Sequence, residues 1–103
     1  MIARKTKLRY QITLLGEAGE ALCQQDLSVF ALPEDAVLAL SLRYFNDPAP
    51  CEIHRAAVHK CAMLELATLC RGRQAVPLEE LTPEQRAFFP AGTRAVRIEE
   101  RAL

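Results

Sequence analysis

The chain has 103 residues, of which 50% are hydrophobic and 25% charged, and its formal net charge is zero. A chain of this length and apolar content can bury a core, which excludes an intrinsically disordered protein. The sequence has no run of 18 or more apolar residues, which excludes a membrane-spanning helix. We therefore expect one folded domain over residues 1–103, with a short basic arm at residues 1–7.

The charge is unevenly distributed, and the first nine residues carry cations only. Arg4, Lys5, Lys7 and Arg9 are weak candidates for nucleic-acid contact, because four cations support only weak, salt-sensitive binding to phosphates. The N-terminus lacks the apolar run and the small-residue cleavage site of a secretory signal. We therefore expect a cytoplasmic protein whose four cysteines are reduced thiols.

Residues 8–15, LRYQITLL, are rich in strand formers and lead into GEAG, a turn with two glycines. A partner strand is predicted to begin near Glu20 and to continue through residues 26–32. Together the two segments predict an N-terminal β-hairpin.

Residues 33–45, PEDAVLALSLRYF, are compatible with two structures. Pro33 followed by two acids is typical of the first turn of a helix. The alternation of Leu38, Leu40, Leu42 and Tyr44 with other residues has instead the period of two that is typical of a strand. We favour a third strand, with residues 33–36 as its turn, and keep the helix as the alternative.

The rest of the chain predicts two helices and a strand. NDPAP at residues 46–50 breaks any element, and residues 52–71 form a long apolar helix with Gly72 at its C-terminal cap. Thr82 and Pro83 predict a short helix over residues 83–89, and the alternation at residues 93–100 predicts a final strand. The expected fold is α+β, a small antiparallel sheet packed on the long helix.

The stretch CEIHRAAVHKC, residues 51–61, brings two cysteines and two histidines together in sequence. On a helix His54 and Cys61 lie about 10 Å apart along the axis, too far for one zinc ion with bonds of about 2.0–2.3 Å. Only Cys51 and His54 could share a metal, and no further residue completes an activated thiol around Cys51. We therefore predict no metal, no cofactor and no catalytic residue, and a protein that is not an enzyme.

The second half of this helix, AMLELATLC, is apolar almost all round, so the face turned away from the sheet needs a second cover. We predict a subunit interface formed by Ala62, Met63, Leu66, Leu69 and Cys70, with residues 74–89 folding back over the helix as the alternative. The favoured function is a homodimeric regulatory or adaptor module that acts through protein contacts. A metal- or thiol-sensing module is a weaker alternative.

Residues 27–58 resemble the ribbon-helix-helix repressors. In that family a strand precedes a Leu-Pro pair that opens a first helix, and a short loop leads into a second helix. Leu32-Pro33, the break at residues 46–50 and Glu52 occupy the corresponding places here. The resemblance implies an obligate dimer that reads the DNA major groove from strand positions Ser28, Phe30 and Leu32. A DNA-binding transcriptional regulator is therefore the alternative function.

Overall fold

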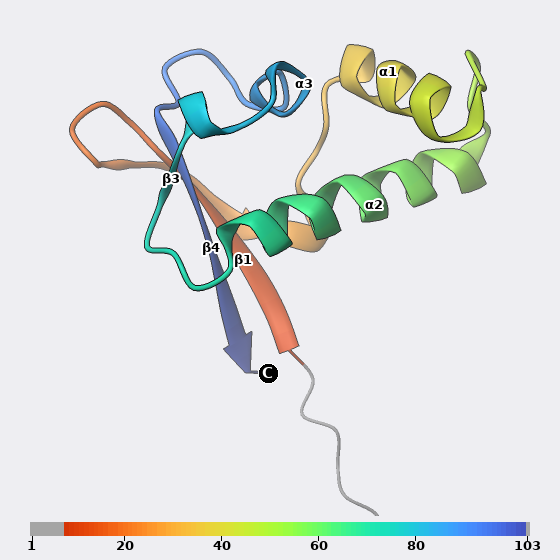
Figure 1. The fold of residues 1–103 in the computed structure, drawn as a ribbon. Coiled ribbons are helices and arrows are strands. Elements are labelled where there is room, and N and C mark those ends of the chain that lie inside the picture. The colour runs from red at the N-terminus through yellow and green to blue at the C-terminus, as the bar shows by residue number, and fades with distance from the viewer. Residues whose placement is uncertain (1–7, 103) are drawn as a thin grey trace, which may run out of the picture.

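The computed structural model describes residues 8–102 as a four-stranded antiparallel sheet with helices packed against it (Figure 1). The strand order is β2-β1-β4-β3, so β1 (Leu8–Leu15) lies between β2 (Ala21–Asp26) and β4 (Ala95–Ala102). The short β3 (Val76–Pro77) pairs with the beginning of β4. The predicted α+β class is confirmed.

The N-terminal hairpin forms where it was predicted. The Gly16 N–H donates to the Glu20 carbonyl at 2.8 Å, and Gly19 turns the chain with a positive φ of 80°. The second strand, however, ends at Asp26, so its predicted extension through residues 27–32 is wrong. The Asp26 carboxylate accepts hydrogen bonds from the Ser28 N–H and hydroxyl at 2.9 and 2.6 Å. This local cap stops the strand and starts a 3₁₀ turn, η1 (Leu27–Val29).

The favoured third strand over residues 33–45 is wrong, because these residues form helix α1 (Glu34–Phe45). The alternation that suggested a strand does not correspond to burial: Leu40 is buried, whereas Leu42 is 49% exposed. The buried positions Ala36, Leu40 and Ser41 have helical spacing. The two acids of the first turn favour the helix N-terminus, and Asn46 ends the helix in a left-handed conformation, with φ of 53°.

The predictions for the C-terminal half are largely confirmed. Helix α2 (Glu52–Cys70) ends one residue earlier than predicted, and Gly72 follows with a positive φ of 73°. Helix α3 (Pro83–Arg86) is shorter than predicted and has a capping box, in which Thr82 and Gln85 each bond the other's backbone N–H at 3.1 Å. Neither β3 nor the 3₁₀ turn η2 (Leu78–Glu80) was predicted.

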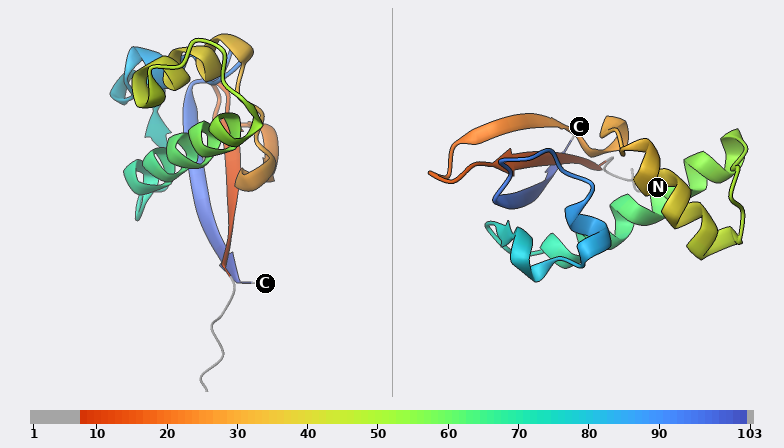
Figure 2. Two further views of the ribbon diagram at one scale, coloured as in Figure 1. Left: turned by 90° about the vertical axis from the view of Figure 1, so that its right-hand side faces the viewer. Right: turned by 90° about the horizontal axis from the view of Figure 1, so that it is seen from above.

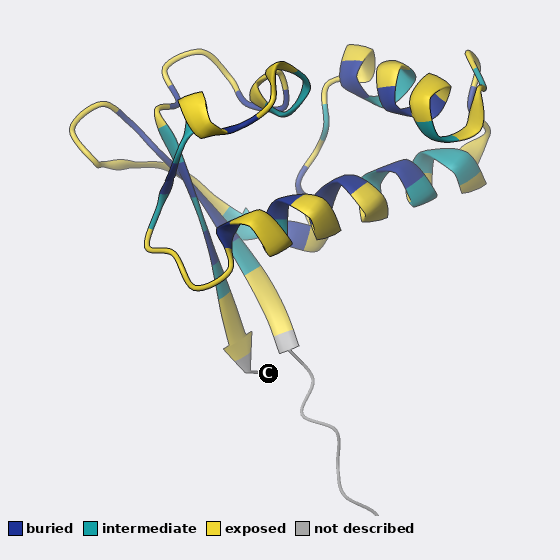
Figure 3. Ribbon diagram, in the orientation of Figure 1, coloured by how far each residue is buried: buried dark blue, intermediate teal, exposed yellow. Residues whose placement is uncertain are grey.

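The three α-helices lie on one side of the sheet, and α2 runs across its face (Figure 2). Directly opposed residues of an antiparallel pair share a face, and the pairs Ile12–Ile98 and Leu14–Val96 are buried there. Helix α1 lies alongside α2 and supplies Ala36 and Leu40 to the same core (Figure 3). Leu81, Phe88 and Phe89 from the segment after α2 belong to this core as well. No helix within residues 8–102 is long and apolar enough to cross a membrane.

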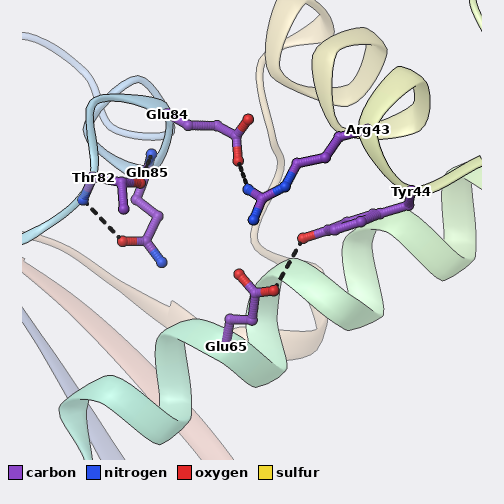
Figure 4. Close-up of polar contacts among 6 residues, drawn as sticks. All are labelled: Arg43, Tyr44, Glu65, Thr82, Glu84 and Gln85. Atoms are coloured by element: carbon purple, nitrogen blue, oxygen red, sulfur yellow. Dashed lines mark hydrogen bonds and ion pairs between the residues drawn. The ribbon is translucent and has the colours of Figure 1, made fainter. Parts of the chain in front are cut away.

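Polar contacts fasten α1 to its neighbours (Figure 4). Arg43 donates to the Glu84 carboxylate of α3 at 2.6 Å, and the Tyr44 hydroxyl donates to the Glu65 carboxylate of α2 at 3.3 Å. Partial burial and the Glu65 charge raise the pKa of Tyr44, which keeps the phenol protonated as a donor. Exposed pairs of this kind add little stability individually, so they orient α1 on a core that apolar packing stabilises.

Ser41 in α1 places a polar hydroxyl in the apolar core. Its side chain is fully buried, and its hydroxyl has no hydrogen-bond partner among residues 8–102. Because an unsatisfied buried hydroxyl is costly, we expect Ser41→Ala to raise the free energy of unfolding by about 1 kcal/mol in urea titrations. Ser28→Ala is the control, since that exposed hydroxyl has a partner and its loss should not stabilise the fold. A destabilised Ser41→Ala protein would contradict this assignment.

Candidate functional site

A groove of about 740 Å³ lies between helix α2 and the sheet, at the end of the sheet where β1 begins and β4 finishes. One wall consists of side chains from the flank of α2. The opposite wall comes from β1 and β4, and the start of η1 closes one end. This volume is in the range of sites that bind small molecules or peptide side chains.

The inner part of the groove is apolar. Met63 and Ala67 of α2 face Ile98 of β4, and Leu27 of η1 completes this surface. Met63 and Ile98 are 5% and 9% exposed, so they are core residues whose edges reach the groove. Leu64 differs, because it lines the same groove with 66% of its surface exposed. It stands out on the helix flank as an apolar side chain without cover.

One ion pair closes the η1 end of the groove. Arg9 Nε lies 3.1 Å from the Asp26 carboxylate, and the same carboxylate caps η1 through Ser28. The hydrogen bonds from Ser28, and then the charge of Arg9, hold the pKa of Asp26 below its ordinary value. Asp26 therefore stays ionised at neutral pH, and it neutralises Arg9.

The sheet wall carries a second polar pair. Tyr10 and Glu100 are directly opposed on β1 and β4, and the Tyr10 hydroxyl donates to the Glu100 carboxylate at 2.9 Å. This hydrogen bond and the Glu100 charge raise the pKa of Tyr10, while the charge of Arg71 acts in the opposite direction. Tyr10 is therefore a phenol at neutral pH, and Glu100 presents its negative charge on the sheet wall.

The helix wall is basic. Lys60 and Arg71 line the groove at its α2 side, and within residues 8–102 neither forms an ion pair with a carboxylate. The exposed Leu64 lies between them along the helix. The groove thus has a cationic wall, an apolar floor and an opposite wall that carries the Glu100 carboxylate.

The two histidines of residues 51–61 each contact a partner within the chain, and His59 also lines the groove. His54 Nδ1 lies 2.8 Å from the Asp47 carboxylate, and its ring stacks on Phe45 with centroids 4.4 Å apart. His59 Nε2 donates to the Phe30 carbonyl at 2.7 Å. Among residues 8–102 no three His, Cys, Asp or Glu side chains come close enough together to hold a metal ion.

The cysteines fall into two environments. Cys23, Cys51 and Cys61 are exposed, whereas Cys70 is buried. Cys61 lies on the outer flank of α2, which accounts for its exposure. Burial raises the pKa of the Cys70 thiol to about 11, which makes it unreactive as a nucleophile at neutral pH.

The predicted subunit interface needs correction. Ala62, Met63, Leu66 and Cys70 are between 0 and 5% exposed in the single chain, so they have almost no surface to offer a partner. Of the five, only Leu69 keeps appreciable exposure, at 37%. The cover that AMLELATLC requires comes from within the chain: its buried residues share one core with α1, the sheet and residues of the segment 74–89.

Of the four nucleic-acid candidates, Arg4, Lys5 and Lys7 lie outside the described residues. Arg9 is described and lies in the groove, paired with Asp26. The ribbon-helix-helix resemblance has a similarly divided outcome. Its two helices correspond to α1 and α2, but residues 27–32 form no strand, and Phe30 is buried at 4% exposure.

Sequence reasoning named Arg9 and Met63 for other roles and missed four further residues that line the groove, namely Tyr10, Lys60, Leu64 and Glu100. The signals were present but weak. The parity of β1 places Tyr10 on the face of Ile12, and Leu64 and Cys61 share the flank opposite Leu66 on the α2 wheel. Neither signal shows that the flank of α2 lies opposite β1 and β4, because the pairing register of β1 with β4 was not predictable from the sequence.

Comparisons of the chain with protein-family models, with curated proteins and with solved structures find no match.

Proposed function

We propose that this protein is a small, non-enzymatic interaction module of the cytoplasm, and that it binds protein through the groove between α2 and the sheet. The observation that carries the proposal is the groove itself, with an exposed leucine beside an apolar floor and charged walls. Protein interfaces typically combine a desolvated apolar centre with a polar rim, which is the arrangement of these side chains.

The distribution of cations favours protein contacts over DNA. Six arginines each lie between 2.5 and 3.1 Å from a carboxylate, namely Arg9, Arg43, Arg55, Arg73, Arg97 and Arg101. Phosphate recognition needs cations gathered on one face and free to replace counterions. The described cations are instead spread over the molecule and largely neutralised.

The test compares the protein binding of two variants, in each of which one exposed apolar residue is replaced by glutamate. Leu64→Glu places a charge on the helix wall of the groove, whereas Ile53→Glu places one at another exposed apolar site, at the start of α2 and outside the groove. We expect tagged wild type and Ile53→Glu to capture the same proteins from the native host, and Leu64→Glu to lose them at least tenfold. Circular dichroism should show that both variants remain folded.

Two results would reject the proposal. If Leu64→Glu captures the same proteins as the wild type, the groove is not the binding surface. If the wild type shifts duplex DNA at nanomolar protein and physiological salt, nucleic acid rather than protein is the partner.

A further inference from the structure

We propose that the groove of one chain is filled by the corresponding surface of a second copy, in a two-fold symmetric dimer. This inference rests on the proposed function, because it names the occupant of the same groove. The proposed dimer does not use the interface predicted from the sequence within AMLELATLC. The contact surface is the outer flank of α2 together with the ends of β1 and β4.

The charges of the two walls are the first argument. Among the residues that the structure describes, Lys60 and Arg71 of the helix wall have no carboxylate partner, and the sheet wall presents Glu100. Arg9 and Asp26 neutralise one another and favour neither sign. A partner that carries charges of only one sign would be repelled by one of the two walls. The groove therefore favours a partner that places acidic groups against the helix wall and basic groups against the sheet wall.

A second copy meets this requirement through symmetry alone. In a two-fold interface, a contact from the helix wall of one protomer to the sheet wall of its partner is repeated in the opposite direction. The cations of each α2 would then face Glu100 of the other protomer. Lys60 and Arg71 of each protomer would then share the Glu100 carboxylate of its partner.

The position of Leu64 is the second argument. Lys60 and Leu64 are four residues apart on α2 and therefore lie on the same flank, with Arg71 about two turns further on. Leu64 is 66% exposed, although Met63, Ala67 and Ile98 form an apolar floor beside it. A partner's Leu64 supplies an apolar side chain for that floor, and its own Leu64 is buried in return.

Charge reversal tests the contact between the walls. One variant reverses the helix wall, with Lys60→Glu and Arg71→Glu together, and the other reverses the sheet wall with Glu100→Lys. We expect the wild type to be a dimer by light scattering at micromolar concentration, and each variant alone to dimerise about 100-fold more weakly because like charges face each other. Circular dichroism checks that each variant is folded.

Mixing the two variants is the decisive measurement. A chain with a reversed helix wall and a chain with a reversed sheet wall have complementary charges at both symmetric contacts. We therefore expect the two monomeric variants to form a one-to-one heterodimer, which native mass spectrometry can identify from a small added tag. Changes confined to one chain cannot produce this rescue. Reversing two exposed residues elsewhere, Glu52→Lys or Glu79→Lys, should leave the dimer intact.

The possible failures can be told apart. A wild type that stays monomeric at high micromolar concentration overturns the dimer, and groove-dependent capture of another protein would leave the proposed function standing. A dimer that neither charge variant weakens, or variants that do not pair when mixed, overturns the placement of the interface in the groove. A monomer whose Leu64→Glu variant also captures the same proteins overturns both proposals.

Discussion

Replacing Leu66 with alanine is expected to lower the free energy of unfolding by about 2–5 kcal/mol. Leu66 is fully buried in the single chain, in a core shared by α1, α2 and the sheet. The deleted atoms lose their transfer free energy, and the cavity that remains costs more because the surrounding helices and strands cannot close over it. Chemical denaturation of the wild type and the variant at one matched protein concentration measures the change, so that any contribution from association is compared at the same concentration.

Leu69 provides the matched control, since it lies one turn further along the same helix and keeps 37% of its surface exposed. Leu69→Ala should cost less than Leu66→Ala, about 1–2 kcal/mol, because more than a third of that residue's surface already contacts water. If the two substitutions cost the same, Leu66 is not a core residue of the single chain. In that case the original prediction of an intersubunit role for Leu66 would have to be reconsidered.

Raising the pH from 9 to above 11 is expected to remove about 3 kcal/mol of stability through the Cys70 thiol alone. Cys70 is 1% exposed, and its burial raises the pKa from 9.0 to about 11. The unfolded chain releases this proton at lower pH than the folded chain does. The contribution is therefore complete below pH 9 and is lost as the pH rises through the folded pKa.

The measurement is the difference in pH dependence between the wild type and Cys70→Ala. The tyrosines Tyr10 and Tyr44 also have raised pKa values and act in the same direction, so only this difference isolates the thiol. Cys61→Ala serves as the control, because Cys61 is exposed. It should leave the alkaline slope unchanged, and a Cys70→Ala slope equal to that of the wild type would contradict the assignment.

Thiol reactivity gives an independent view of the same residue. At neutral pH a water-soluble thiol reagent should modify the exposed Cys23, Cys51 and Cys61 in the folded protein. Cys70 should react only after denaturation, since it is both inaccessible and protonated. Rapid reaction of all four thiols in the native protein would show that the end of α2 opens readily.

Local sequence signals were sufficient where an element's own residues decide its structure. Gly16 and Gly19 supply the turn of the hairpin, and Thr82 with Pro83 starts α3. The break at residues 46–50 and the absence of Gly or Pro inside residues 52–70 determine the extent of α2. In each case a cap, a turn or a backbone restriction acts within a few residues, so the amino-acid sequence alone was enough to predict it.

Tertiary structure decided the remaining features, because they depend on what each segment packs against. Residues 34–45 have a weak helical face and an alternating pattern, and contact with α2 selects the helix by burying Ala36 and Leu40. Leu66 and Leu64 are chemically identical and two residues apart. Yet the fold buries the first in the core and leaves the second exposed beside the groove. The groove itself exists only because β1 pairs with β4 across more than eighty residues and sets Tyr10 opposite Glu100, a register that no local signal specifies.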